Sequence, residues 1–123
     1  MTEKTPPVEG NWVMEAAPAA CTLPTVDRPL RAAEWDDLFA TATRAVHRID
    51  ALSARWELQP DPGVAAHAGD LTVRETRCCS FFTFVLTATG GQLTLDVSTP
   101  AEQVEVLDAM VDWARTRIGA GSR

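Results

Sequence analysis

The stretch Thr89-Gly90-Gly91-Gln92 constrains the fold of this chain more than any other part of the sequence. Adjacent glycines readily adopt the left-handed backbone conformations that a two-residue hairpin turn requires. Residues 81–88, before the turn, are rich in aromatic and β-branched side chains, and residues 93–98, after it, alternate between apolar and polar. Both patterns are typical of β-strands. The sequence therefore predicts an antiparallel hairpin around this turn.

A second pair of strands is expected between Val46 and Gln59. Side chains alternate between two faces over most of this stretch, and a turn near residues 52–54 would join its two halves. Pro60 and Pro62 then end the second strand, because proline has no N–H group to offer to a sheet. The sequence therefore predicts two hairpins.

Three helices are expected around these strands. The first runs from a cap at Asp27 to about Arg44, and the second runs from Val64 to about Cys79. The third begins at Thr99 as its N-cap, and Glu102 completes a capping box. This third helix carries a wide apolar stripe, formed by Val104, Leu107, Val111, Ala114 and Ile118.

The order of these elements, α-β-β-α-β-β-α, predicts an α+β domain. We expect a four-stranded antiparallel sheet with the helices packed on one face. The 123 residues fit one domain, which we expect over residues 21–119. Residues 1–20 are proline-containing and lack a sustained period, so we expect a disordered or loosely docked tail there, and a frayed end over residues 120–123.

Charge and hydropathy argue against several kinds of partner. The net charge is −6 at pH 7, and the eleven basic residues do not cluster, so we expect no nucleic-acid partner. No run of about 18 apolar residues is present, so we expect no membrane partner. The first ten residues lack the basic and apolar regions of a secretory signal. We therefore expect a cytoplasmic protein, whose three cysteines are kept as thiols.

Two adjacent cysteines, Cys78 and Cys79, stand where the second helix is expected to end. Adjacent Cα atoms are about 3.8 Å apart, below the usual disulfide range of about 4.4–6.8 Å, so Cys21 is the better oxidation partner for either thiol. Neighbouring side chains diverge by about 100° in a helix and face opposite sides in a strand. Both thiols can therefore converge only at an irregular junction, such as a helix-to-strand switch.

The cysteines admit two interpretations. Thiols are often buried as small hydrophobic side chains, and three phenylalanines follow this pair closely. Alternatively, Cys78, Cys79 and Cys21 bind a soft metal or metalloid ion of the mercury, arsenic or copper type, because thiolates prefer such ions. Glu75 would share a helical face with the pair, where it could relay a proton or act as an outer ligand.

The two histidines are weaker candidates for this site. His67 precedes Cys78 by eleven residues, which corresponds to about 16 Å along a continuous helix and excludes a shared ion. His47 belongs to a predicted strand and could approach the thiols.

The segment Glu75-x-x-Cys78-Cys79-x-Phe81-Phe82, preceded by Cys21, resembles a pattern shared by a group of small bacterial proteins. Adjacent cysteines followed by phenylalanines are also similar to a segment of organomercurial lyases, which are much longer and in which two thiols and an acid cleave a carbon–mercury bond. The resemblance implies that Cys78 is the thiol of that segment, that Cys21 is its partner and that an acidic residue supplies the proton.

Together these features predict thiol-based binding of a soft metal or metalloid ion by Cys21, Cys78 and Cys79. Two alternatives remain. A homodimeric interaction module with structural cysteines could use Trp12-Val13-Met14 or the apolar stripe of the last helix as its dimer face. A lyase-like thiol enzyme would use Glu75 as a catalytic residue.

Overall fold

The computed structural model describes residues 28–118 of the chain. The predictions for the two terminal segments, for Cys21 and for Asp27 lie outside these residues. The described elements are α2 (Arg28–Asp37), the π-helix η2 (Leu38–Ala42), β1 (Thr43–Asp50), β2 (Ser53–Leu58), α3 (Pro62–Cys78), β3 (Thr83–Thr89), β4 (Gln92–Ser98), the 3-10 helix η3 (Ala101–Gln103) and α4 (Val104–Arg117).

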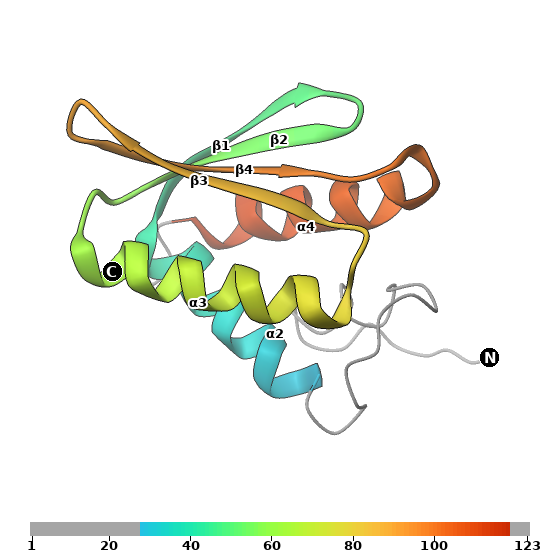
Figure 1. Cartoon of the computed structure of the whole chain (residues 1–123), viewed down its shortest axis with the longest axis horizontal. Helices are drawn as coiled ribbons and strands as arrows, with labels where there is room; N and C mark the ends of the chain where they lie inside the picture. The colour runs from blue at the N-terminus through green and yellow to red at the C-terminus, as the bar shows by residue number, and fades with distance from the viewer. Residues whose placement is uncertain (1–27, 119–123) are drawn as a thin grey trace.

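The four strands form one antiparallel sheet in the order β1-β2-β4-β3. The two hairpins join through β2 and β4, which pair from Ser53 opposite Ser98 to Leu58 opposite Leu93. Figure 1 shows α2, α3 and α4 on one side of this sheet. The predicted α+β class and the predicted element order are therefore confirmed. No helix within residues 28–118 is long and apolar enough to cross a membrane.

The predicted Gly-Gly hairpin is confirmed. Gly90 and Gly91 have φ angles of 57° and 77°, and Thr89 pairs with Gln92 across the turn. Such φ angles are unfavourable for residues with a Cβ atom. The turn therefore depends on both glycines.

Replacement of two glycines, Gly91 and Gly69, by alanine is expected to change the free energy of unfolding in opposite directions. Gly91→Ala should lower the free energy of unfolding by about 1–2 kcal/mol, because alanine is strained at a positive φ. Gly69→Ala in α3 should raise it by about 0.5–1 kcal/mol, because a helical alanine is less costly than glycine and a Cβ atom there meets nothing within 4 Å. Urea denaturation measures both changes. Equal signs for the two variants would contradict this account.

One aromatic ring connects the helices to the sheet. Phe39 is fully buried, and its ring centroid lies 5.8 Å from that of Trp35, 5.9 Å from that of Trp56 and 5.0 Å from that of Trp113. These tryptophans belong to α2, β2 and α4. A single core therefore holds the sheet and two of its covering helices together.

The first helix ends differently from the prediction. The α-helix stops at Asp37 and a π-helix continues to Ala42, two residues before the predicted end near Arg44. Thr43 already has extended angles, and its hydroxyl group donates a hydrogen bond to the carbonyl of Leu38. Four of the five residues in this π-helix are buried. Strand β1 consequently begins before Val46.

The predicted capping box of the last helix is also wrong. The 3-10 helix η3 intervenes before α4, and no side chain caps either element. Thr99 is buried, and its N–H group instead donates a hydrogen bond to the carbonyl of Leu52 in the first hairpin turn. This long-range contact replaces the local one that the sequence pattern suggested.

The apolar stripe of α4 faces the protein interior. Leu107, Val111 and Ala114 are buried, and Val104 and Ile118 are partly covered. This stripe packs on the sheet and on α2, so it does not form the predicted dimer face.

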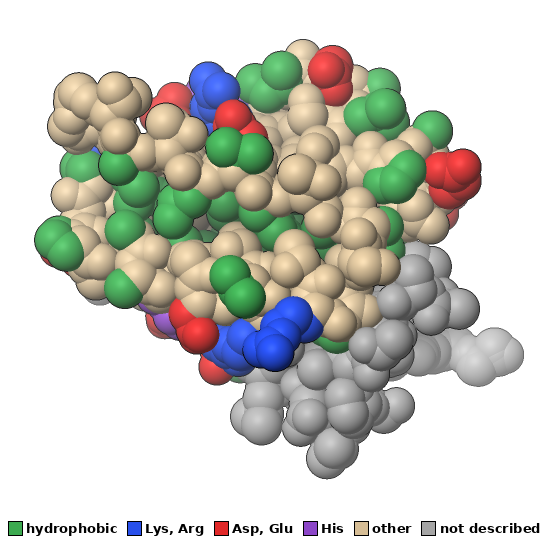
Figure 2. All heavy atoms as spheres, viewed as in Figure 1, with side chains coloured by type: hydrophobic (Ala, Val, Ile, Leu, Met, Phe, Trp, Pro, Cys, Tyr) green, Lys and Arg blue, Asp and Glu red, His purple; other side chains and the backbone are tan. Residues whose placement is uncertain are grey.

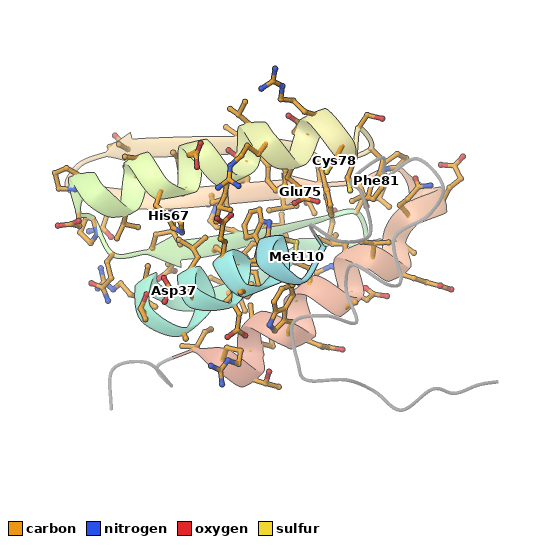
Figure 3. The ribbon with its side chains drawn as sticks, turned by 90° about the horizontal axis from the view of Figure 1, so that it is seen from below. Asp37, His67, Glu75, Cys78, Phe81 and Met110 are labelled. Carbon is orange, nitrogen blue, oxygen red and sulfur yellow. The ribbon has the colours of Figure 1, made fainter. Side chains whose placement is uncertain are left out.

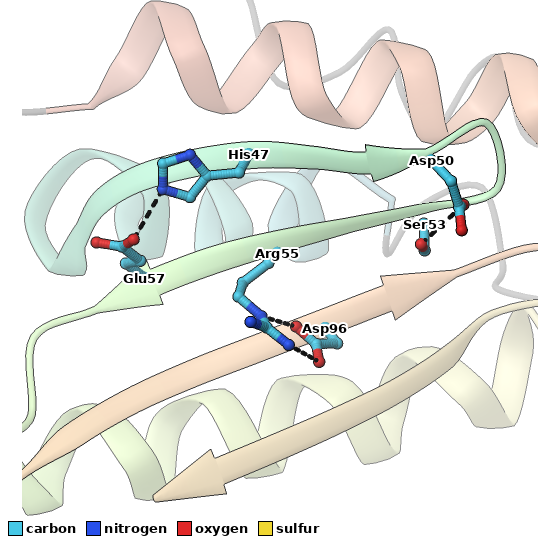
Figure 4. A network of polar contacts seen from close by, with 6 residues as sticks. All are labelled: His47, Asp50, Ser53, Arg55, Glu57 and Asp96. Carbon is cyan, nitrogen blue, oxygen red and sulfur yellow. Dashed lines mark hydrogen bonds and ion pairs between the residues drawn. The ribbon is translucent and has the colours of Figure 1, made fainter. Parts of the chain in front are cut away.

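The opposite face of the sheet carries polar pairs (Figure 4). Arg55 of β2 holds Asp96 of β4 by two hydrogen bonds of 2.6 and 3.0 Å. His47 of β1 contacts Glu57 of β2 at 2.7 Å. The helices lie on the other side of the sheet (Figure 1), and α3 ends at Cys78, so His47 does not approach the thiols.

Candidate metal centre

Hydrogen bonds mark both ends of helix α3. The Asp61 carboxylate accepts hydrogen bonds from the N–H groups of Gly63 and Val64, at 2.9 and 3.2 Å. At the other end, the N–H group of Cys79 donates a 2.7 Å hydrogen bond to the carbonyl of Glu75. The backbone of Cys79 is no longer helical, with φ −121° and ψ 80°. The helix therefore stops between the two cysteines.

This junction brings the two thiols together. The Sγ atoms of Cys78 and Cys79 are 3.8 Å apart. That distance is far longer than an S–S bond of about 2.05 Å. It equals the separation of two sulfurs that each lie about 2.3 Å from one tetrahedral ion. The predicted convergence at the helix end is confirmed.

Glu75 points to the same place. Its carboxylate and the two sulfurs all lie within 4.8 Å of one another, and all three residues are buried. Figure 3 shows Glu75 and Cys78 close together near one end of α3, with Phe81 beyond them. The site therefore offers one oxygen and two sulfur donors.

Trp35 orients the carboxylate. Its indole Nε1–H group donates a 3.0 Å hydrogen bond to Glu75 Oε1 from α2. The helical spacing of Trp35, Leu38 and Phe39 indicates a packed helix face, but it assigns Trp35 no hydrogen-bond partner. A buried indole N–H group generally needs an acceptor, and this requirement was the only signal in the sequence that pointed to such a contact.

A cluster of aromatic rings adjoins the site through Trp35. The centroids of Phe81 and Phe82 are 4.6 Å apart, those of Phe82 and Phe84 are 5.2 Å apart, and Phe84 stacks on Trp35 at 5.8 Å. Cys79 is 1% exposed. Electrostatic interactions are stronger in such a water-poor environment than at the surface.

Arg74, on the same helix as Cys78, forms ion pairs with two other carboxylates. Arg74 forms ion pairs of 2.8 Å with both Asp70 and Glu34. The hydrogen bonds that Arg74 donates to Asp70, together with the nearby Glu34 carboxylate, hold the pKa of Arg74 above its ordinary value. Arg77 is exposed.

His67 is remote from the cysteine pair, as predicted. Figure 3 places it on α3, well away from Cys78 along the helix. Cys21, the third predicted ligand, lies outside the described residues. The structure thus brings together Glu75, Cys78 and Cys79 from the predicted set.

Removal of the Glu75 carboxylate is expected to destabilise the fold. Glu75→Ala should lower the free energy of unfolding by about 1–3 kcal/mol, because it removes the buried acceptor of the Trp35 indole. Glu75→Gln keeps a side-chain oxygen and should cost less. Urea denaturation followed by tryptophan fluorescence compares the two variants. Equal losses would show that the indole hydrogen bond contributes little.

No protein-family model, curated protein or solved structure matches this chain significantly. The similarity to a segment of organomercurial lyases therefore stays a prediction.

Proposed function

We propose that this protein binds a soft metal or metalloid ion, of the mercury, arsenic or copper type, through the thiolates of Cys78 and Cys79. One observation carries the proposal. Two sulfurs 3.8 Å apart and a carboxylate lie within 4.8 Å of one another in a buried site.

The donor set favours a soft ion. Thiolate sulfur prefers ions such as Cu(I), and structural zinc sites generally require four protein ligands. Within residues 28–118 the site offers two sulfurs and one oxygen. Cys21 would supply a third thiolate, with Glu75 then acting as an outer partner. Ions that accept two or three sulfurs suit either arrangement.

The chemistry of the thiols predicts how binding depends on pH. An ion that binds both sulfurs displaces the thiol protons, so binding should release protons and strengthen as the pH rises. The negative end of the α3 dipole adds to the preference for a cation.

Titration of the reduced protein tests the proposal. We expect Hg(II), As(III) or Cu(I) to bind wild-type protein, and Cys78→Ser/Cys79→Ser to weaken that binding by at least about a hundredfold, which corresponds to about 2.7 kcal/mol. Glu75→Gln should weaken it by about 10–100-fold, the usual effect of losing an outer partner. Isothermal titration calorimetry measures these affinities, and Zn(II) serves as the harder competitor.

Glu57→Gln provides the matched control. Glu57 is half-exposed and contacts His47 on the opposite face of the sheet, so its loss should leave ion affinity unchanged. If the double serine variant binds every ion as tightly as wild type, the cysteine pair is not the site. If the Glu57 and Glu75 variants lose equal affinity, the effect of Glu75 is not local.

The position of Glu75 favours one second function, the cleavage of a carbon–mercury bond. The protonated carboxyl group would transfer its proton to the departing carbon, and Hg(II) would remain on the two thiolates. The supporting observation is the carboxylate within 4.8 Å of both sulfurs. Release of benzene from a phenylmercury salt measures this reaction. No release by wild-type protein, or unchanged release by Glu75→Gln, would exclude it.

A further inference from the structure

Strand β3 forms one edge of the sheet in the part of the chain that the structure describes. Within residues 28–118 it pairs only with β4. Its seven residues, Thr83–Thr89, include no charged residue and no proline. Val85 and Leu86 are large apolar side chains that remain 51% and 36% exposed. Figure 2 shows hydrophobic side chains gathered on the face where β3 and α3 lie side by side.

The other edge of the sheet is protected. Strand β1 carries Arg44, His47, Arg48 and Asp50, and its pairing with β2 is interrupted twice by register shifts. Charged side chains and bulges are the usual devices that keep an edge strand from pairing with another chain. Strand β3 has neither charged side chains nor a bulge, so it can pair with a strand of another chain more readily than β1 can.

The hairpin turn determines which backbone groups β3 exposes. A two-residue turn closes on a hydrogen-bonded pair, here Thr89 and Gln92, and such pairs then recur at every second residue. Thr87 and Val85 therefore bond to β4. The N–H and C=O groups of Phe84, Leu86 and Ala88 point away from the sheet, where a further strand would meet them.

We propose that β3 is the interface of a homodimer, in which two copies pair antiparallel about a two-fold axis through Leu86. This register overlaps the whole strand. It places Phe84 of one copy opposite Ala88 of the other, Val85 opposite Thr87, and Leu86 opposite itself.

The pairing is self-complementary. A large residue faces a small one at each end, two leucines meet at the centre, and no like charges face each other. A two-fold axis requires such matching of a surface with itself. The product is one continuous antiparallel sheet twice as wide as that of a single chain, with both copies of α3 on the same side. The exposed Val73 adds apolar surface on that helix.

Sedimentation velocity of the reduced full-length chain over about a hundredfold range of concentration tests the proposal. We expect a concentration-dependent dimer. Leu86→Lys should raise its dissociation constant by at least about tenfold, because two lysines would face each other at the axis. Ile49→Lys is the matched control, since Ile49 is 54% exposed on β1, and it should leave the dimer unchanged. Circular dichroism shows whether each variant is folded.

Amide hydrogen exchange of the wild-type chain tests the register without any substitution. The amides of Phe84, Leu86 and Ala88 should be protected in the dimer and should lose protection on dilution, whereas those of Val85 and Thr87 should keep it. A chain that stays monomeric at every concentration would overturn the proposal. A dimer that Ile49→Lys weakens as much as Leu86→Lys, or one in which the three outward amides exchange equally fast at all concentrations, would also overturn it.

Discussion

A soft thiophilic ion, present at about a thousand times its dissociation constant, is expected to raise the free energy of unfolding by up to about 4 kcal/mol. The physical reason is that the folded chain holds Cys78, Cys79 and Glu75 within 4.8 Å of one another. In the unfolded chain only the adjacent thiols of Cys78 and Cys79 stay near each other, so the shift measures the affinity that folding adds. Urea denaturation with and without the ion measures it.

The thiols provide the control for this shift. Cys78→Ser/Cys79→Ser should show the same stability with and without the ion, and a small dithiol chelator should reverse the shift in wild-type protein. A stabilisation that survives in the double variant would mean that the ion binds elsewhere on the folded chain.

Replacement of Phe39 by alanine should lower the free energy of unfolding by about 3–5 kcal/mol. The ring is fully buried and contacts the rings of Trp35, Trp56 and Trp113. Its loss leaves a cavity between two helices and the sheet, and the surrounding tryptophans are too large to close it without strain. Chemical denaturation followed by tryptophan fluorescence measures the change.

Ile49→Ala is the control for this prediction. Ile49 is 54% exposed on β1, so its truncation should change stability by no more than about 0.5 kcal/mol. If Phe39→Ala costs less than about 1 kcal/mol, the core collapses around the lost ring and Phe39 does not hold the layers together.

Trp35 connects the core to the candidate metal centre. It packs against Phe39 and Phe84 and donates its indole hydrogen bond to Glu75. The position of the carboxylate therefore depends on the packing of the core, and not only on helix α3, which carries it.

Local patterns were sufficient for much of the fold. Gly90 and Gly91 specify a turn whose conformation other residues rarely adopt, and the flanking alternation specifies strands. The end of α3 at the cysteine pair could also be predicted, since aromatic and β-branched residues follow it. These features rest on interactions between residues that are close in the sequence.

Other features could not be predicted in this way. A π-helix occupies Leu38–Ala42, where the spacing predicted a regular helix. The N–H group of Thr99 donates a hydrogen bond to the carbonyl of the distant Leu52, and Thr99 does not act as a cap. The protected edge at β1 and the open edge at β3 follow from the order of the strands, which depends on the pairing of β2 with β4. Such long-range contacts leave no local pattern.

The sequence by itself determined the kinds and order of the elements, the tight turn and the junction at which two thiols can converge, because backbone preference and side-chain period act locally. Only the tertiary structure decided that Glu75 is buried beside those thiols. Its acceptor role for Trp35 joins residues that are 40 positions apart. The packing of α2 against α3 brings those two residues together, and that packing results from burial of the shared aromatic core.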